Sequence, residues 1–110
     1  MRVDSAKVPA PPFKGMMPIL PTAIRESGEL DEVSERRLVQ YCLQCGAVAI
    51  GHLGGASEFY KVANDDRARL IKIIVDEVAG RVPVFIGVTA PATRAAVQNA
   101  GKHRRSGPIC

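Results

Sequence analysis

The sequence contains no tryptophan, and aromatic residues make up only 5% of its 110 residues. It also lacks any hydrophobic run near the ~20 residues that a membrane-spanning helix needs. Residues 1–12 have no signal-peptide core and include three prolines, which oppose regular structure. We therefore expect a cytoplasmic protein without membrane contact, in which residues 1–12 are an irregular lead-in.

Cysteine is also scarce, since the chain has only Cys42, Cys45 and Cys110. An odd number without a secretion signal predicts reduced thiols. Cys42 and Cys45 have the CxxC spacing, but they lie at the end of a predicted helix, where the dipole disfavours a thiolate. Zinc would need two further ligands at motif spacing, which the sequence does not offer. We expect Cys42 and Cys45 to be buried core residues, and we expect no metal site.

Acidic residues are absent from the last nine residues, which contain Lys102, Arg104 and Arg105. The net charge is +4, and without these three residues it would be +1. The positive excess is therefore confined to one end of the chain, and no basic face is visible elsewhere. We expect a solvated basic tail and no nucleic-acid partner.

Short apolar runs alternate with longer amphipathic stretches along the chain. This order predicts three strand–helix units, a parallel sheet and right-handed crossovers. The predicted strands are Gly15–Leu20, Ala47–Ile50 and Val82–Val88, and the predicted helices run from Asp31 to Gly46, from Asn64 to Gly80 and from Thr93 to Ala100.

N-caps and apolar stripes support the predicted helices. Asp31, Asn64 and Thr93 are suitable N-caps, and Asp65 and Asp66 place negative charge at the positive end of the second helix dipole. Helical spacing predicts two buried stripes, which are Leu38, Tyr41, Cys42 and Cys45 in the first helix and Leu70, Ile71, Ile74, Val75 and Val78 in the second.

Three parallel strands are too few to close a sheet. An open edge leaves backbone hydrogen-bonding groups unpaired, and a complete (β/α)8 barrel needs about 250 residues. The chain is therefore either a small three-layer sandwich or the first part of a barrel that ends early.

Four segments occur in an order that points to one family. They are MPILPT at 17–22, GELD at 28–31, LGGASE at 53–58 and GRVPVFIGV at 80–88. With these segments, residues 13–100 resemble the N-terminal part of the dihydrodipicolinate synthase / N-acetylneuraminate lyase family. The resemblance ends near Ala100, so we expect residues 101–110 to be a divergent tail, as a truncation or a frameshift would produce.

The resemblance implies an α/β fold consisting of the first three β/α units of a truncated (β/α)8 TIM barrel. Family members are class I aldolase-type lyases, usually tetrameric, in which a lysine forms a Schiff base with pyruvate or another 2-oxo acid. They need no cofactor, and a tyrosine relays protons. The loop after the second strand helps to hold the substrate carboxylate.

In this chain the family's hydroxyl pair falls on Gly55 and Ala56, neither of which has a hydroxyl group. Backbone N–H groups in a glycine-rich turn can still cradle an anion. We therefore expect a divergent subgroup with a different substrate. Glu58 is expected to organise the loop, and His52 either contacts substrate or covers the strand end. The predicted substrate-binding residues are Thr22, His52, Gly54, Gly55, Ala56, Ser57 and Glu58.

A Schiff-base lysine needs a lowered pKa, which comes from burial or from a cationic neighbour. Lys14, Lys61, Lys72 and Lys102 all lie outside the apolar strand ends. In the family, the lysine and the tyrosine come from later strands, so we predict no catalytic residue here and no lyase activity of the chain alone. The alternative is a non-catalytic α/β module that associates through its open sheet edges, and a tetramer is doubtful for such a short chain.

Overall fold

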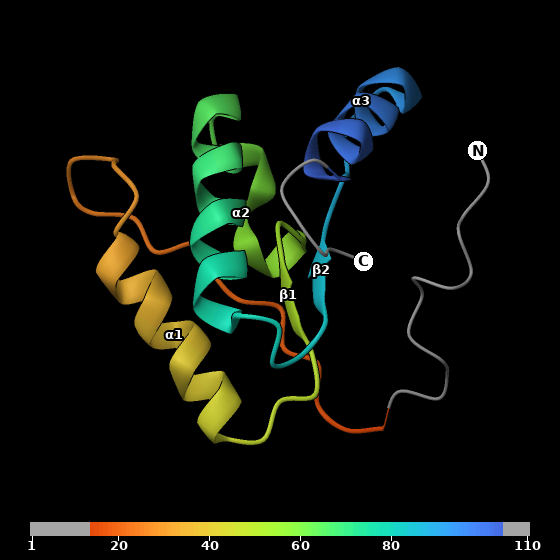
Figure 1. The fold of residues 1–110 in the computed structure, drawn as a ribbon. Helices are drawn as coiled ribbons and strands as arrows, with labels where there is room; N and C mark the ends of the chain where they lie inside the picture. Colours follow the sequence, from red (N-terminus) through yellow and green to blue (C-terminus); the bar gives the residue numbers. More distant parts are fainter. Residues whose placement is uncertain (1–13, 105–110) are drawn as a thin grey trace.

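Two short parallel strands lie at the centre of the computed structural model, which describes residues 14–104 (Figure 1). β1 comprises Ile50–His52 and β2 comprises Val84–Ile86, with Ile50 opposite Val84. β2 lies within the third predicted strand, and the parallel pairing is as predicted.

The second predicted strand, Ala47–Ile50, begins three residues too early. The N–H of Ala47 still bonds to the carbonyl of Cys42, at 3.0 Å, and so belongs to the end of the preceding helix. The N–H of Val48 bonds to Met16 O, and the N–H of Ile50 bonds to Pro83 O next to β2, both at 3.0 Å. The apolar run therefore includes a connection as well as the strand.

The first predicted strand, Gly15–Leu20, forms only one isolated bridge, between Ile19 and Gly51. Gly51 donates its N–H to Pro18 O and accepts at its carbonyl from Leu20 N–H, each at 2.9 Å. Pro18 has no N–H to donate, which limits the pairing. The segment thus runs parallel to β1 as an extended edge, and the spatial order is residues 16–20, β1, β2.

The first helix, α1, comprises Glu32–Gln44. Asp31 is its N-cap as predicted, accepting from Ser34 N–H at 3.1 Å. The helix ends before Gly46, whose φ of +88° suits glycine.

The predicted buried face of α1 is partly wrong. Tyr41 is 65% exposed and Cys45 is exposed, while Cys42 is only half-buried. The fully buried positions are instead Glu35 and Val39. The charge of Glu35 hid this stripe, because a carboxylate is buried only when partners elsewhere in the fold satisfy it.

The second helix, α2, comprises Asn64–Val78 and is amphipathic as predicted. Of the predicted stripe, Val75 is half-buried and the other four residues are buried. Asn64 is the first helical residue rather than the cap, because Ala63 occupies the N-cap position without a side-chain bond. Ile73 and Arg67 of this helix are also buried.

The third helix, α3, comprises Thr93–Arg104 and extends four residues beyond the predicted end at Ala100. Gly101 lowers helix propensity but does not stop this helix. The predicted lead-in 1–12, most of the predicted tail and Cys110 lie outside the described residues.

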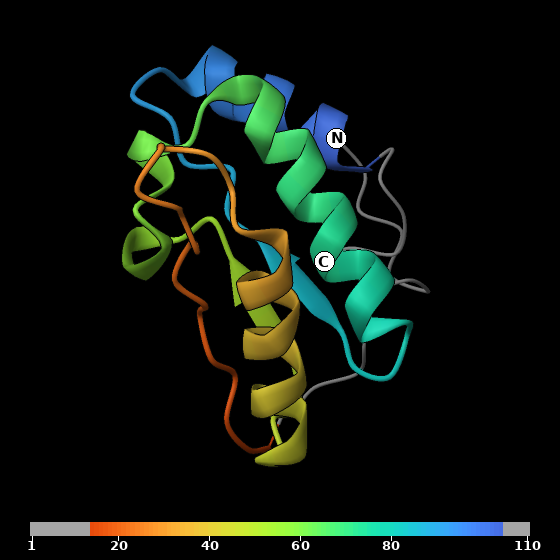
Figure 2. The same cartoon turned by 90° about the vertical axis from the view of Figure 1, so that its left-hand side faces the viewer.

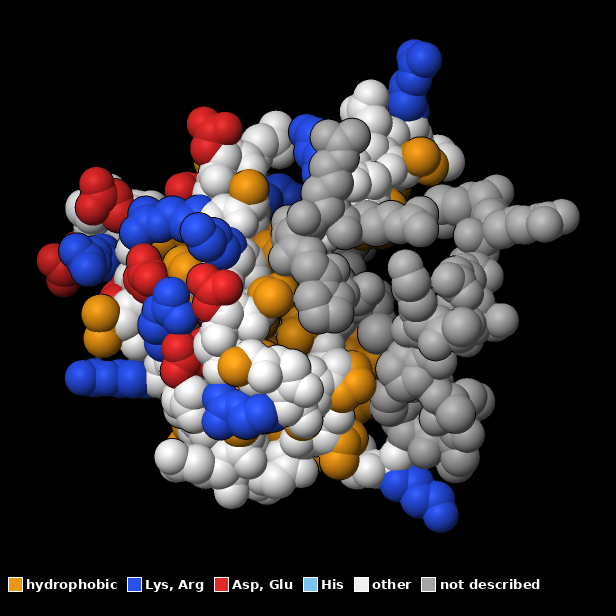
Figure 3. Space-filling model, in the orientation of Figure 1, with side chains coloured by type: hydrophobic (Ala, Val, Ile, Leu, Met, Phe, Trp, Pro, Cys, Tyr) orange, Lys and Arg blue, Asp and Glu red, His pale blue; other side chains and the backbone are white. Residues whose placement is uncertain are grey.

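The helices α1 and α2 pack side by side on one face of the strands, and α3 lies beyond the end of β2 (Figures 1 and 2). The core lies beneath α1 and α2 and includes Ile50, Leu70 and Ile74. Acidic and basic side chains alternate on the outer side of these helices (Figure 3). There Arg36 pairs with Glu32 and Glu77, each at 2.9 Å.

The other face of the sheet is less covered within residues 14–104. Gly51 and Phe85 lie on this face because side chains alternate along a strand. With Met17 and Ile19 they line a hollow of about 380 Å³. No helix in the described part of the chain is long and apolar enough to cross a membrane.

Candidate functional site

The glycine-rich loop follows the carboxyl end of β1. Leu53 has φ +58°, and a 3-10 turn then spans Gly55–Ser57. Glu58 again adopts a left-handed conformation, with φ +50°, before a second 3-10 turn at Phe59–Lys61. Two left-handed residues that are not glycine therefore bracket the turn, so the loop has a defined and locally strained path.

The turn leaves two backbone donors free. Ser57 N–H bonds to Gly54 O at 3.1 Å, and Glu58 N–H bonds to Gly55 O at 3.0 Å. The N–H groups of Gly55 and Ala56 have no acceptor among residues 14–104, and both residues are exposed. A Cβ atom added to Gly55 would meet nothing within 4 Å. The predicted carboxylate-binding turn thus has two N–H donors on exposed residues that no acceptor within residues 14–104 occupies.

Thr22 and Ser57, the two predicted substrate-binding residues with a hydroxyl group, hold the loop in place. Ser57 is 0% exposed, and its Oγ donates to Leu20 O. Thr22 Oγ1 donates to Ser57 O at 2.6 Å. Both hydroxyls therefore tie the turn to the end of the first extended segment, and the Ser57 hydroxyl points into the protein.

His52 lies inside the core, with 1% of its surface exposed. Its Nε2 is 2.9 Å from Glu35 Oε1 and 3.2 Å from Pro21 O, and its Nδ1 accepts from Leu53 N–H at 2.7 Å. Sequence reasoning missed Glu35. The available signal was its position four residues before Val39, on what becomes the buried side of α1.

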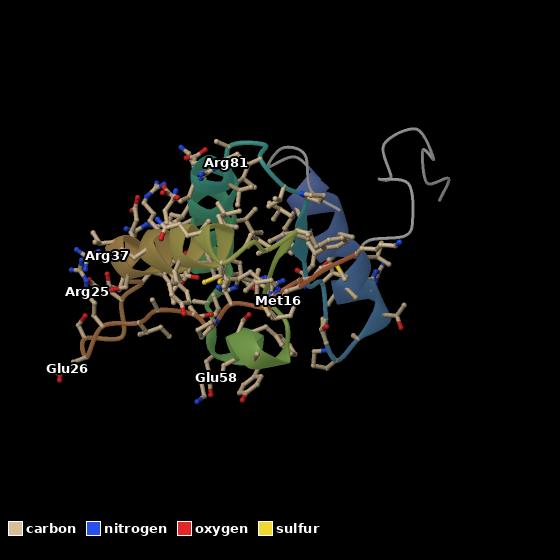
Figure 4. The ribbon with its side chains drawn as sticks, turned by 90° about the horizontal axis from the view of Figure 1, so that it is seen from below. Met16, Arg25, Glu26, Arg37, Glu58 and Arg81 are labelled. Atoms are coloured by element: carbon tan, nitrogen blue, oxygen red, sulfur yellow. The ribbon has the colours of Figure 1, made fainter. Side chains whose placement is uncertain are left out.

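Glu58 points outward from the loop and away from α1 and α2 (Figure 4). Its Oε1 lies 2.9 Å from Lys61 Nζ, and this hydrogen bond raises the pKa of the exposed Lys61. A raised pKa keeps the amine protonated, whereas an imine-forming lysine must lose its proton. Lys14, Lys72 and Lys102 are also exposed. The absence of a Schiff-base lysine from the whole chain stays a prediction.

The end of β2 lies against the start of this loop. Gly87 N–H bonds to His52 O at 2.9 Å, and a Cβ atom at Gly87 would lie 2.2 Å from Leu53 O. Gly87 O accepts from Arg67 Nη2, at 3.2 Å, and Arg67 Nη2 also lies 3.4 Å from His103 Nε2. Burial lowers the pKa of Arg67 and is the main cause of the lowered pKa of His103.

The predicted site residues are therefore brought together at one edge of the sheet, although they face different ways. Gly55, Ala56 and Glu58 are exposed, whereas His52 and Ser57 are buried beneath them. A glycine-rich turn with free amide groups at the carboxyl end of parallel strands is how α/β-barrel enzymes commonly bind anionic groups. The arrangement places the chain in the α/β class with parallel strands.

The chain belongs to the dihydrodipicolinate synthetase family, whose sequence model matches residues 12–110. It is 34% identical over 99 residues to a 4-hydroxy-tetrahydrodipicolinate synthase of Methylibium petroleiphilum, covering 90% of this chain and 34% of that protein. It is 33% identical over 84 residues to an L-2-keto-3-deoxyarabonate dehydratase of Azospirillum brasilense, covering 76% and 27%.

The fold matches YagE of Escherichia coli K12, a family member whose structure is in complex with pyruvate. The TM-score is 0.80 at 25% identity, and the match covers 86% of this chain and 32% of that one. The matched structures are TIM-barrel lyases of this family, which confirms the predicted fold class. The chain spans about a third of the length of the relatives it matches.

Proposed function

We propose that this chain is part of a lyase that forms a Schiff base with pyruvate or another 2-oxo acid, and that residues 53–58 hold the substrate carboxylate. The free N–H groups of Gly55 and Ala56 carry this proposal. Two adjacent donors in an exposed turn suit a carboxylate, and hydrogen bonds to a charged acceptor are stronger than neutral ones. Pyruvate bound to the E. coli relative supports the choice of ligand class.

The loop binds without side-chain hydroxyls in this proposal. Gly55 and Ala56 have none, and the hydroxyls of Thr22 and Ser57 donate to backbone carbonyls. A threonine-based proton relay is therefore absent from this loop. This favours a substrate other than that of a true dihydrodipicolinate synthase, and the relative that is a keto-deoxy sugar acid dehydratase provides one precedent.

The remaining parts of the proposal concern the whole enzyme. The imine-forming lysine and the relay tyrosine come from strands beyond this chain, so residues 1–110 alone have no lyase activity. The complete enzyme is a cytoplasmic homo-oligomer that needs no cofactor. Borohydride reduction with pyruvate tests the first point, and a covalent adduct on the pure chain would disprove it.

Proline at position 55 offers a direct test of carboxylate binding by the N–H groups of Gly55 and Ala56. Gly55→Pro removes one N–H, and the extended conformation of Gly54, with φ −91° and ψ −169°, suits a residue before proline. Gly55→Ala is the matched control, because it keeps the N–H and its Cβ meets open space. Pyruvate titration followed by amide NMR should show about tenfold weaker binding for Gly55→Pro alone. Equal affinity of both variants would contradict the cradle.

A second candidate is a non-catalytic module that associates through its open sheet edges. The exposure of Met16, Met17 and Ile19, at 69%, 45% and 46%, favours it, because these apolar residues lie along the edge next to β1. Sedimentation separates the two candidates. A discrete, cooperatively folded dimer that does not bind pyruvate supports the module, and a monomer that binds pyruvate supports the lyase.

A further inference from the structure

The hydrogen bonds of His52 determine where its ring carries a proton. Nδ1 accepts from Leu53 N–H at 2.7 Å, so Nδ1 carries no hydrogen. The ring hydrogen is therefore on Nε2, which faces Glu35 Oε1 at 2.9 Å and Pro21 O at 3.2 Å. Both of these groups accept, which makes the assignment consistent on every side of the ring.

Glu35 selects this tautomer. Its side chain is 1% exposed, and its second oxygen, Oε2, accepts from Ala23 N–H at 2.7 Å. A carboxylate held in this way can accept from His52 but cannot donate to it, so Nε2 must be the donor. The orientation of Nδ1 as an acceptor thus depends on a residue of α1.

The acceptor at Nδ1 holds the first peptide of the loop. Leu53 has φ +58°, a conformation that costs an L-residue free energy and persists only where its surroundings impose it. His52 binds the N–H of Leu53, and the carbonyl of Leu53 packs against Gly87, where a Cβ atom would lie 2.2 Å away. Both sides of this residue are therefore constrained before the turn that carries Gly55 and Ala56.

Stability alone does not account for such a pair. Apolar groups of the same shape can replace both partners of a buried hydrogen bond with little loss of stability, or with a gain. The Glu35–His52 contact joins α1 to the end of β1 and, through Ala23 and Pro21, to the end of the first extended segment. The loop departs from the end of β1, and Ser57 Oγ ties it to the first extended segment at Leu20 O.

We propose that Glu35 and His52 are positioning residues for the carboxylate-binding loop, with Glu35 fixing the His52 tautomer and His52 Nδ1 fixing the left-handed turn at Leu53. The identity of the ligand in this inference rests on the proposed function. The positioning role of Glu35 and His52 rests on their hydrogen bonds alone. Neither side chain touches the substrate.

Two substitutions at position 52 separate the two sides of the ring. In the variant His52→Asn, the side-chain oxygen lies near the position of Nδ1 and can accept from Leu53 N–H, but the side chain does not reach Glu35. In the variant His52→Gln, the longer side chain reaches toward Glu35 but has no acceptor near Leu53 N–H. Val39→Ala is the matched control for lost stability, since Val39 is a fully buried residue on the same helix as Glu35.

Amide NMR provides a readout that does not depend on any ligand. The HN–Hα coupling of Leu53 and the amide signals of Gly55 and Ala56 should stay close to wild type in His52→Asn and Val39→Ala and change in His52→Gln. In the wild type, the ¹⁵N signals of His52 should report a bare Nδ1 and a protonated Nε2, and Glu35→Gln should give a mixture of tautomers. These tautomer measurements also decide the case if His52→Gln does not fold.

Pyruvate titration is the second readout. Affinity should fall about tenfold in His52→Gln and should remain near wild type in His52→Asn and Val39→Ala. A protonated Nδ1 in the wild type, or an unchanged Leu53 coupling in folded His52→Gln, overturns the positioning role. If the wild type binds no pyruvate, the proposed function fails, while the NMR result still decides the positioning role.

Discussion

The loops that follow β1 and β2 start at the same edge of the sheet, but they are held in different ways. The loop after β1 is tied down by side chains on both sides, through Thr22, His52 and Ser57. Among the described residues, the side-chain bonds to the loop after β2, residues 87–92, are longer: Arg67 donates to Gly87 O at 3.2 Å and Asn99 donates to Val88 O at 3.4 Å.

This difference supports the proposal that the loop after β1 is the one that binds substrate. A binding site needs its backbone held by neighbouring side chains, because freedom lost on binding weakens affinity. The loop after β1 combines such support with two free amide groups at Gly55 and Ala56. The loop after β2 packs against it at Gly87 and so acts mainly as its support.

The largest expected effect comes from breaking the contact between the two loops. Gly87→Ala places a Cβ atom 2.2 Å from Leu53 O, which is backbone and cannot move aside alone. We expect a loss of about 3 kcal/mol or more in the free energy of unfolding, measured by urea denaturation. The control is Gly51→Ala, where the Cβ atom would lie 2.3 Å from the flexible end of Ile19 and the nearest backbone atom, Pro18 O, is at an ordinary contact distance of 3.4 Å. Equal losses in both variants would contradict a backbone contact at Gly87.

The next effect concerns the support beneath the first loop. Ser57→Ala removes a fully buried hydroxyl and leaves Leu20 O without its donor. We expect a loss of about 2 kcal/mol, because a buried carbonyl left unpaired carries its full desolvation cost. Thermal and urea unfolding measure this loss. Ala56→Ser is the control, as it adds a hydroxyl at an exposed position of the same turn, and a comparable loss there would point to the turn's backbone instead.

A smaller effect is a pH dependence at the end of α3. Burial first, then the charges of Arg67 and Lys102, lower the pKa of His103 below its usual 6.5. The unfolded chain therefore binds more protons than the folded one, so His103 favours folding fully above about pH 6.5 and loses this contribution as the pH falls toward its folded pKa.

Unfolding measured at about pH 7.5 and about pH 5.5 tests this dependence. The wild type should lose more stability over this interval than His103→Gln, which cannot titrate. The carboxylates of Asp31 and Glu77 have lowered pKa values and act at more acidic pH, so they do not mask the effect. Parallel curves for the two proteins would exclude His103 as the cause.

The sequence was sufficient to predict the elements whose signals are local. Alternation of apolar runs and amphipathic stretches predicted the parallel strands, and the stripe of α2 was predicted because its apolar residues recur at helical spacing. The glycine-rich loop was located because it follows an apolar run.

The features that sequence reasoning missed depend on distant partners. Glu35 is buried because Ala23 and His52, 12 and 17 residues away, satisfy its carboxylate. The inward hydroxyl of Ser57 depends on Leu20, which lies 37 residues earlier in the chain. No local pattern carries these contacts, so the sequence analysis left Glu35 out of the buried face of α1 and predicted Ser57 as a substrate-binding residue.

The smallest expected loss in the free energy of unfolding comes from removing one side-chain hydrogen bond in each loop. Thr22 Oγ1 bonds to Ser57 O at 2.6 Å, and Asn99 Nδ2 bonds to Val88 O at 3.4 Å. We expect Thr22→Val to cost about 1 kcal/mol and Asn99→Ala to stay within about 0.5 kcal/mol of wild type, both measured by urea unfolding. If Asn99→Ala costs as much as Thr22→Val, the loop after β2 depends on its own side-chain bond, and the contrast between the two loops no longer identifies the binding loop.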